Sequence, residues 1–250
     1  MPDRKTVIVT GASSGIGAAT ARLAAQNGYD VAIGYRTNKT AAQATAKAVE
    51  QAGGRACLIA GDLSQPDDIE RFFAQFDANF PRLDALVNNA GIVDPAARVD
   101  QMDYARLRRN FDTNLIGPML LAGHAVRRMS RAQGHQGGSI VNISSVASRI
   151  GSAGRCVDYA ASKAGIDIFT KGLSQEVAAE GIRVNAIRPG AIDTPIHAGS
   201  GQPDRSGQLA ALIPMQRMGT SDEVADTVLW LMSDQASYVT GTLVDVSGGR

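Results

Sequence analysis

The sequence contains few of the residues and segments that mark specialised classes of protein. Its 250 residues include only two cysteines, Cys57 and Cys156, and three histidines, so neither a disulfide framework nor the ligand spacing of a metal site is present. We therefore expect no bound metal. No run reaches the ~18 consecutive apolar residues of a membrane-spanning helix, and the N-terminal MPDRKTVIVTG leads almost at once into a strand. These absences predict a cytoplasmic protein with no signal peptide and no membrane partner.

An excess of charge of either sign is also missing. Lysine and arginine total 25, and aspartate and glutamate total 24, so the composition gives no indication of a nucleic-acid partner. The local cluster of Arg106, Arg108 and Arg109 is interpreted as the solvated face of a helix. No break in composition divides the chain, and its length suffices for a large buried core. We expect one domain over residues 1–250.

Apolar, β-branched runs alternate with longer helical patterns from the first residues to the last. Strands are expected at 5–10, 30–35, 56–60, 85–88, 140–143, 183–187 and 243–246. Helices are expected at 16–27, 40–52, 66–79, 102–112, 115–131, around Tyr159, and at 221–233. This alternation predicts an α/β fold: a single-domain, Rossmann-like, doubly wound parallel sheet of about seven strands with helices on both faces.

The segment between the first strand and the first helix reads T-G-A-S-S-G-I-G at residues 10–17. A glycine-rich turn in this position is typical of dinucleotide-binding folds. Gly11 would allow the tight turn, Gly15 the close approach of a pyrophosphate, and Gly17 the packing of helix against strand. The helix would direct its N-terminal N–H groups and the positive end of its dipole at the phosphates. The predicted contacts are Gly11, Ser13, Ser14, Gly15, Ile16 and Gly17.

The end of the second strand indicates which dinucleotide binds. Residues 34–38 read GYRTN and contain no acid, whereas folds that prefer NAD usually place a carboxylate there for the ribose hydroxyls. The guanidinium of Arg36, next to Thr37, would instead bind a 2′-phosphate. The alternative is that Arg36 is an ordinary solvated loop residue. The sequence thus favours NADPH/NADP+ over NADH/NAD+.

The stretch from residue 138 to 166 brings together groups that can move a proton. Tyr159 and Lys163 are four residues apart, so they share one face of a helix. Ser144 and Ser145 follow a buried strand, at the end where open α/β sheets bind ligands. A lysine ammonium ~4 Å from the phenol contributes roughly 4 kcal/mol at an effective dielectric constant of about 20. Before desolvation, this could lower the pKa of the tyrosine by up to ~3 units and make it a general acid–base.

A tyrosine and a lysine at this spacing are by themselves common, so the rest of the chain must decide. Its remaining motifs are Asp62-Leu63, Asn88-Asn89-Ala90-Gly91, Asn114, Pro189-Gly190 with Thr194, Val239-Thr240-Gly241 and Gly248-Gly249. With these motifs, the turn at 10–17 and the Ser-Tyr-Lys set, the chain resembles the short-chain dehydrogenase/reductase family from residue 5 to its C-terminus. Its overall pattern is similar to the 3-oxoacyl-reductase and glucose-dehydrogenase-like members.

The resemblance implies a role for each catalytic position. Ser145 would polarise the substrate oxygen and Tyr159 would pass the proton. Lys163 would bind the nicotinamide ribose and lower the pKa of the tyrosine, and Asn114 would hold a water leading to Lys163. Further cofactor contacts implied by the resemblance are Asp62 at the adenine, Leu63, Asn88, Ala90, Gly91, Tyr159, Lys163, Pro189, Gly190, Ile192 and Thr194. A homotetramer packed through the long helices after Asn114 and around Tyr159 is also implied.

Two positions depart from the family pattern. Ser145 stands fourteen residues before Tyr159, where thirteen is common, so the Ser/Gly loop at 149–155 is expected to carry one extra residue. Its neighbour Ser144 points to the opposite side of the strand if alternation holds, and alignment selects Ser145. Ser14 occupies a position where many NADP-using relatives carry Arg or Lys, which leaves Arg36 as the main phosphate contact.

The least regular segment, 194–219, is rich in glycine and proline and is interpreted as a substrate lid. The predicted function is an NADP(H)-dependent oxidoreductase that interconverts a carbonyl and a secondary alcohol. The substrate would be a small molecule: a ketone, a 3-oxo thioester or a sugar. The alternatives are an NAD-dependent alcohol dehydrogenase of the same family and a non-catalytic NADPH-binding regulator. The complete set of Asn114, Ser145, Tyr159 and Lys163 argues against the regulator.

Overall fold

Seven parallel strands form one sheet in the computed structural model, which describes residues 4–194 and 210–250. The strands are β1 (Lys5–Val9), β2 (Tyr29–Tyr35), β3 (Ala56–Ala60), β4 (Ala85–Asn88), β5 (Gly138–Ile143), β6 (Ile182–Pro189) and β7 (Leu243–Val246). Their order across the sheet is β3-β2-β1-β4-β5-β6-β7, and every neighbouring pair runs parallel. The predicted doubly wound, Rossmann-like sheet is confirmed.

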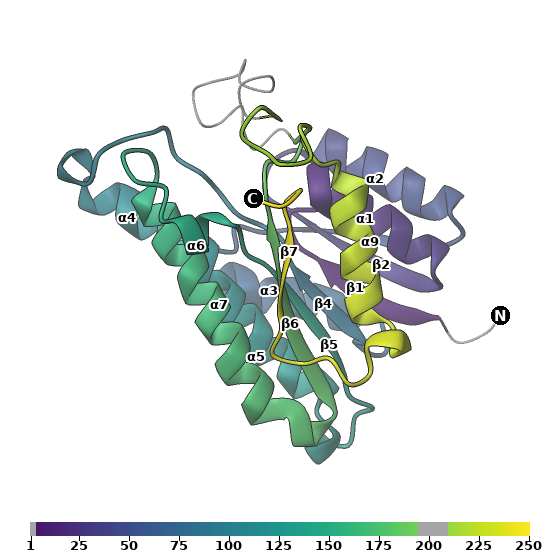
Figure 1. The fold of residues 1–250 in the computed structure, drawn as a ribbon. Coiled ribbons are helices and arrows are strands. Elements are labelled where there is room, and N and C mark those ends of the chain that lie inside the picture. The colour runs from purple at the N-terminus through teal and green to yellow at the C-terminus, as the bar shows by residue number, and fades with distance from the viewer. Residues whose placement is uncertain (1–3, 195–209) are drawn as a thin grey trace.

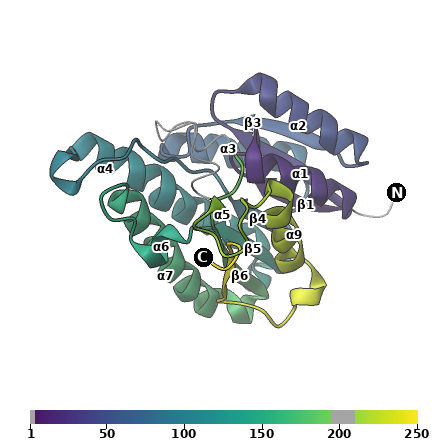
Figure 2. The ribbon, with the colours of Figure 1, turned by 45° about the horizontal axis from the view of Figure 1, so that its top comes forward.

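Helices cover both faces of this sheet (Figures 1 and 2). The helices α1 (Gly15–Gln26), α2 (Lys39–Gln51) and α9 (Ser221–Met232) pack on one face. The other face carries α3 (Pro66–Asn79), α5 (Gly117–Met129) and α7 (Val157–Val177). Among the described residues, no helix is both long and apolar enough to span a bilayer.

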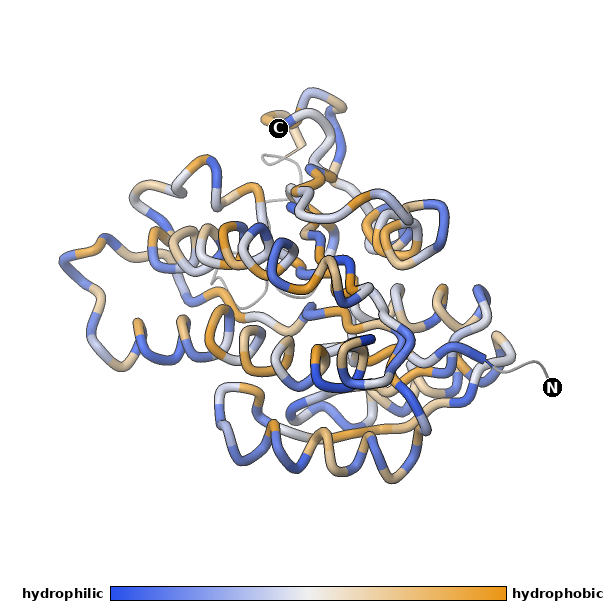
Figure 3. Tube along the Cα trace, turned by 90° about the horizontal axis from the view of Figure 1, so that it is seen from below, coloured by the Kyte–Doolittle hydropathy of each residue, from blue (hydrophilic) through white to orange (hydrophobic). Residues whose placement is uncertain are grey.

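Alternation along the central strands explains the two cores. In β1, Val7 and Val9 contribute to the core under α1, α2 and α9, whereas Ile8 contributes to the opposite core. All three are fully buried, as expected of a parallel strand covered on both faces. The helices alternate hydrophobic and hydrophilic residues along their length (Figure 3), because each lays one face on a core and leaves the other in water.

Several helices begin at residues whose side chains cap them. Asn38 accepts a hydrogen bond from Ala41 N (3.0 Å) at the start of α2, and Asp103 accepts one from Arg106 N (2.8 Å) at the start of α4 (Tyr104–Phe111). Thr220 and Glu223 form a reciprocal capping box at α9. The caps satisfy N–H groups that the first helical turn leaves open, and so fix where the chain turns back towards the sheet.

The strand order reverses between β1 and β4. From this point the chain after β1 and the chain after β4 turn to opposite sides of the sheet, and a crevice opens between them at the carboxyl ends of the strands. This edge is at the top of Figure 1 and turned forward in Figure 2. Any ligand of this fold is therefore expected there.

Two segments differ from the sequence prediction, and a third lies largely outside the described residues. The stretch after β5 contains a short helix, α6 (Ala147–Ile150), where a loop was expected. The helices expected at 102–112 and 115–131 form one continuous path, because a π-helical turn, Asp112–Ile116, joins α4 to α5. Of the expected lid at 194–219, residues 195–209 lie outside the described residues; its two ends are joined by a parallel bridge between Ile192 and Gly219.

Candidate active site

A cleft of about 550 Å³ occupies the carboxyl edge of the sheet, a size typical of sites for small molecules and cofactors. It is lined by the glycine-rich turn, the tip of β2 and the segments that follow β3, β4, β5 and β6. The predicted site residues that line it are Gly11, Ser13, Ser14, Gly15, Ile16, Arg36, Thr37, Asp62, Leu63, Ala90, Gly91, Ser145, Tyr159, Lys163, Pro189, Gly190, Ile192 and Thr194. Residues from nearly the whole length of the chain thus line one cleft.

The glycine-rich turn has the shape that a phosphate requires. Gly11 and Gly15 have φ angles of +62° and +55°, a region that side chains disfavour. A Cβ on Gly17 would lie 2.5 Å from Asn89 Nδ2 and 2.6 Å from the Gly11 carbonyl oxygen. Within the described chain, Ser14 at the N-cap of α1 receives no side-chain capping hydrogen bond, which leaves the helix N-terminus available to an anion. The turn therefore fits the pyrophosphate of a dinucleotide.

Asn89 holds this turn in place from the next strand. Its Nδ2 donates to the carbonyl oxygens of Thr10 (2.8 Å) and Gly11 (3.2 Å). Thr10 Oγ1 in return accepts hydrogen bonds from the backbone N–H groups of Asn89 (2.9 Å) and Ala90 (3.0 Å). These reciprocal bonds join the segments after β1 and β4 at the point where the strand order reverses.

Arg36 and Asp62 face each other at the far end of the cleft. Arg36 Nη1 lies 3.9 Å from Asp62 Oδ2, and the two side chains are 54% and 36% exposed. Asp62 Oδ1 accepts hydrogen bonds from the backbone N–H (3.0 Å) and the hydroxyl (2.7 Å) of Ser64. An exposed pair at this distance is weak, so the guanidinium can turn to a phosphate at small energetic cost.

Ser145, Tyr159 and Lys163 meet in the middle of the cleft. Ser145 Oγ accepts a hydrogen bond from Ala147 N (3.1 Å) and lies close enough to the phenol of Tyr159 to lower its pKa. Ser144 Oγ points away from the phenol and donates to the backbone carbonyl of Lys163 (3.1 Å). The structure thus places Ser145, and not Ser144, beside Tyr159, in agreement with the alternation argument.

The sequence-based estimate of the tyrosine pKa was wrong for the protein alone. Burial raises the pKa of Tyr159 to about 12, against the opposing effect of its hydrogen bond with Ser145. Lys163 Nζ lies 5.8 Å from the centroid of the Tyr159 ring and donates to the carbonyl oxygen of Ile143 (2.7 Å). Because the ammonium is directed at a backbone carbonyl and the phenol is desolvated, burial outweighs the expected charge effect.

Burial also acts on Lys163 itself. It lowers the pKa of this ammonium to about 8, partly offset by the carboxylate of Asp167. Lys163 is thus a buried group whose charged form is held in place by the Ile143 carbonyl and a nearby acid, at some expense of stability.

This depressed pKa predicts a pH dependence of folding. Lys163 is charged in both states below pH 8 and neutral in both above about pH 10.5; between these values the unfolded chain binds more protons, so stability rises with pH. The free energy of unfolding, measured in urea, should therefore rise more in the wild type than in Lys163→Met between these two pH values. We expect this difference to reach up to roughly 3 kcal/mol. Both proteins contain Tyr159, so the effect of its titration cancels when the two free energies of unfolding are compared. Lys171→Met, exposed on the same helix, is the control, and an unchanging difference for Lys163→Met would contradict the prediction.

Asn114 lies in the π-helical turn, fully buried, below the cleft rather than on its wall. Its Oδ1 accepts from Ile92 N (2.8 Å), and its Nδ2 donates to the Ile92 carbonyl (2.9 Å) and to Asn110 Oδ1 (3.1 Å). A Cβ on Gly91 would come within 3.0 Å of Asn114 Oδ1 and 3.5 Å of Lys163 Nζ. Glycine at 91 therefore keeps space between the two polar groups, where the predicted water would have to sit.

Two other predicted cofactor residues do not line the cleft. Gly17 lies behind the turn and acts through its close packing against Asn89. Asn88 is buried beneath the floor, where its Nδ2 donates to Asn142 Oδ1 (2.9 Å) and to the Pro118 carbonyl (3.2 Å). The side chain predicted to contact the cofactor thus joins β4 to β5 and α5 instead, because the side chain of the last strand residue points into the core.

The interpretation of Arg106 as a solvated residue was wrong. Only 12% of its side chain is exposed, and it forms an ion pair with Asp158, which is 1% exposed. Arg108 and Arg109 are about half exposed, as expected. The signal in the sequence was Asp158 itself, an acid within an alanine-rich helix beside Tyr159, for which a buried partner should have been sought.

One of the two cysteines lies at this site, and no metal-binding cluster is found in the part of the chain that the structure describes. Cys57 and Cys156 are free thiols; Cys156 lines the cleft, and burial raises its pKa. Within residues 4–194 and 210–250, no group of three His, Cys, Asp or Glu side chains is placed to hold a metal ion.

Comparison with known proteins assigns the family. A family model described as "Enoyl-(Acyl carrier protein) reductase" matches residues 11–250. YgfF, an uncharacterised oxidoreductase of Escherichia coli K12, is 49% identical over 97% of this chain and 98% of that protein. The cis-4-hydroxycyclohexanecarboxylate dehydrogenase of Sinomonas cyclohexanicum is 41% identical over 98% and 96%, respectively. A short-chain dehydrogenase of Burkholderia cenocepacia J2315, solved with NADP, superimposes with a TM-score of 0.90 at 30% identity, covering 98% of this chain and 97% of that one. The chain therefore belongs to the short-chain dehydrogenase/reductase family of oxidoreductases, as its motifs predicted.

Proposed function

We propose that this protein is an NADP(H)-dependent oxidoreductase that interconverts a carbonyl and a secondary alcohol, with Tyr159 as the general acid–base. The observation that carries the proposal is the convergence of Ser145, Tyr159 and Lys163 in a cleft that also contains a phosphate-binding turn. A regulator that only bound the cofactor would need no phenol beside a serine and a lysine in that cleft.

The roles of the side chains follow from their positions. A reduced nicotinamide bound in the cleft would supply the hydride. Ser145 Oγ and the Tyr159 phenol are neighbours, so both can hydrogen-bond one substrate oxygen and stabilise the charge that develops on it. Tyr159, whose pKa of about 12 keeps it protonated at neutral pH, is in the correct state to donate a proton in the reducing direction. Lys163, held by the Ile143 carbonyl, supplies positive charge at the base of the site.

An activity panel tests this proposal. The purified protein is supplied with NADPH or NADH and with ketones, dicarbonyls, 3-oxoacyl thioesters and sugars, and cofactor oxidation is followed. We expect consumption of NADPH with at least one carbonyl. Tight NADPH binding without turnover on any carbonyl, or on the matching alcohols with NADP+, would support the regulator instead.

The proposed preference for NADPH rests on Arg36 and on the absence of an acid at the tip of β2. Its guanidinium is exposed, lines the cleft, and is paired only weakly with Asp62. The similar Burkholderia structure contains NADP, which supports the proposal. An NAD-dependent alcohol dehydrogenase remains the alternative within the family.

Arg36→Leu should therefore weaken NADPH binding selectively. Charge-assisted hydrogen bonds contribute ~1.5–3 kcal/mol, so we expect the Kd for NADPH to rise about 10- to 100-fold and the Kd for NADH to change little. Fluorescence titration of both cofactors measures this. Arg155→Leu, which removes another exposed arginine of the same cleft, is the control. Equal losses for both cofactors, or a wild type that prefers NADH, would contradict the role of Arg36.

The substrate is proposed to be a small carbonyl or alcohol. A relative 41% identical to this chain is named for a hydroxycyclohexanecarboxylate, which supports an alcohol on a compact carbon skeleton. A homotetramer remains a proposal as well. It is supported by apolar side chains that are exposed on the long helices, Ile116, Met119 and Leu120 at 40%, 43% and 38% and Ile168 at 69%.

A further inference from the structure

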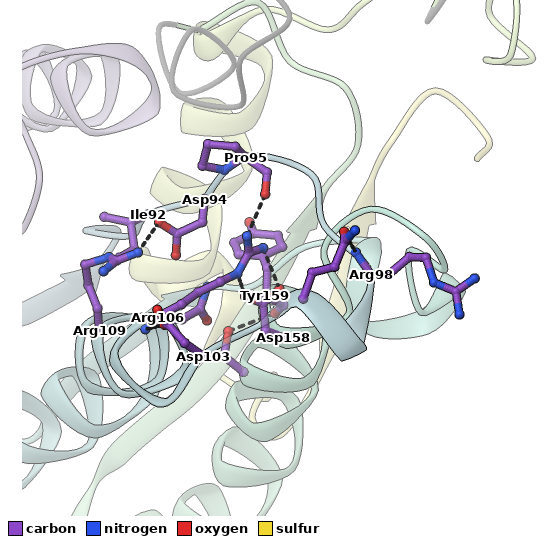
Figure 4. Close-up of polar contacts among 12 residues, drawn as sticks. Ile92, Asp94, Pro95, Arg98, Asp103, Arg106, Arg109, Asp158 and Tyr159 are labelled. Atoms are coloured by element: carbon purple, nitrogen blue, oxygen red, sulfur yellow. Dashed lines mark hydrogen bonds and ion pairs between the residues drawn. The ribbon is translucent and has the colours of Figure 1, made fainter.

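Arg106 connects three segments that are far apart in the sequence. From α4, its Nε donates to Asp158 Oδ2 (2.7 Å) and its Nη2 lies 3.4 Å from Asp158 Oδ1, in the first turn of α7. Its Nη1 donates to the carbonyl oxygen of Pro95 (2.7 Å), in the segment that follows β4. Figure 4 shows the guanidinium between these two partners, with a dashed contact to each.

Both partners adjoin the site. Asp158 immediately precedes Tyr159 on α7. Pro95 lies between Asp94 and Ala96, both of which line the cleft. Within the described chain, the N-cap residue of α7, Cys156, makes no side-chain capping hydrogen bond, so the start of this helix depends on other contacts. The ion pair between Asp158 and Arg106, whose side chains are 1% and 12% exposed, is one contact that holds it.

We propose that Arg106 is a positioning residue: through Asp158 it fixes the first turn of α7, and hence the Tyr159 phenol, and through Pro95 it fixes the adjoining wall of the substrate pocket. The proposal rests on the function assigned above to Tyr159. A guanidinium suits this task because its planar, forked donors can hold a carboxylate and a carbonyl in different directions at once. A lysine ammonium in the same place could satisfy one of these partners but not both in the same geometry.

The neighbouring arginines provide a natural comparison. Arg109 Nη2 pairs with Asp94 Oδ1 (2.8 Å), so it holds the same wall. Arg108 pairs with Asp112 along its own helical path (3.1 Å). Among the described residues, neither has a hydrogen bond or ion pair with α7. Arg106 is therefore the member of the cluster whose removal should affect the phenol.

The test compares Arg106→Gln, Arg106→Lys and the double variant Arg106→Gln/Asp158→Asn with Arg108→Gln and Arg109→Gln. Since misplacement of a reacting group by ~1 Å can cost ~100-fold, we expect Arg106→Gln to lower kcat about 10- to 100-fold without changing the Kd for NADPH. Arg106→Lys should recover part of kcat but show a raised KM for the carbonyl, because Lys can replace the contact to Asp158 but not also that to Pro95. Arg109→Gln should change KM and leave kcat within about threefold, and Arg108→Gln should change neither.

A readout independent of turnover separates this proposal from the proposed function. With 3-fluorotyrosine in place of the five tyrosines, Tyr159→Phe identifies the ¹⁹F resonance of Tyr159. That resonance should shift or broaden in Arg106→Gln and stay in place in Arg109→Gln, even if no substrate is ever found. If Arg106→Gln fails to fold because Asp158 is left unpaired, the double variant, which buries no lone charge, gives the same measurement. An unmoved Tyr159 resonance, or equal losses of kcat in Arg108→Gln and Arg106→Gln, would overturn the proposal.

Discussion

Tyr159→Phe is expected to lower kcat for carbonyl reduction by about 10³-fold and to leave the Kd for NADPH within about threefold. The substitution removes one oxygen and keeps the ring. That oxygen is the partner of Ser145 and the proposed proton donor. The ring's contacts and the neighbouring Lys163 remain, so the binding surface for the cofactor should be preserved. Steady-state kinetics on the best carbonyl of the panel, with fluorescence titration of NADPH, measures both quantities.

Tyr35→Phe is the matched control for this prediction. Tyr35 also lines the cleft, but at the end of β2 beside Arg36, away from Ser145. Loss of its hydroxyl should leave kcat within about threefold. A joint loss of turnover and NADPH affinity in Tyr159→Phe would mean that the phenol supports the cleft structurally. Full activity in that variant would remove Tyr159 from the mechanism altogether.

Gly17→Ala is expected to weaken cofactor binding although it adds only one methyl group. The new Cβ would lie 2.5 Å from Asn89 Nδ2, 2.6 Å from the Gly11 carbonyl and 2.9 Å from Ala12 Cα. Two of these atoms belong to the backbone of the phosphate turn, so the turn or α1 has to move. Overpacking of this kind typically costs ~1–3 kcal/mol of stability. Displacement of the turn should also raise the Kd for NADPH at least about tenfold, because the N–H groups no longer converge on the phosphates.

Gly172→Ala separates this clash from the general effect of a glycine in a helix. Gly172 lies on the exposed side of α7, and a Cβ there would meet no described atom within 4 Å. Relief of the backbone entropy of glycine should stabilise the protein by ~0.5–1 kcal/mol. Urea unfolding and NADPH titration of both variants complete the comparison. If Gly17→Ala left both the free energy of unfolding and the Kd for NADPH unchanged, the turn would be able to move without cost, and Asn89 would not fix its position.

The parts of the fold that the sequence predicted are those governed by local pattern. The central strands are buried on both faces and read as apolar runs, and all seven expected strands lie within a few residues of their observed bounds. The glycine turn was recognisable because a strand, a positive φ and a helix start must occur in that order. The Tyr159–Lys163 pair followed from helical periodicity, and Ser145 from its place at the end of β5.

The features that the sequence did not predict depend on how segments that are distant in the sequence pack together. The direction of the Lys163 ammonium is set by the Ile143 carbonyl, a backbone group that no side-chain pattern reports. Asn88 and Asn89 are identical in type, yet one faces the core and the other the turn. Arg106 looked like its neighbours in the sequence, and only the packing of α4 on α7 distinguishes it from Arg108 and Arg109.

The bridge between Ile192 and Gly219 pairs two parts of the chain that are 27 residues apart in the sequence. Gly219 N donates to the Ala191 carbonyl (3.0 Å) and Asp193 N to the Gly219 carbonyl (2.9 Å), so the residues just after β6 are paired with the residue just before α9. With both ends fixed, doubling the length of the chain between them costs only ~0.6 kcal/mol of closure entropy. A change in the number of residues between Ile192 and Gly219 is therefore expected to cost little stability, because the pairing of the two flanks does not depend on it.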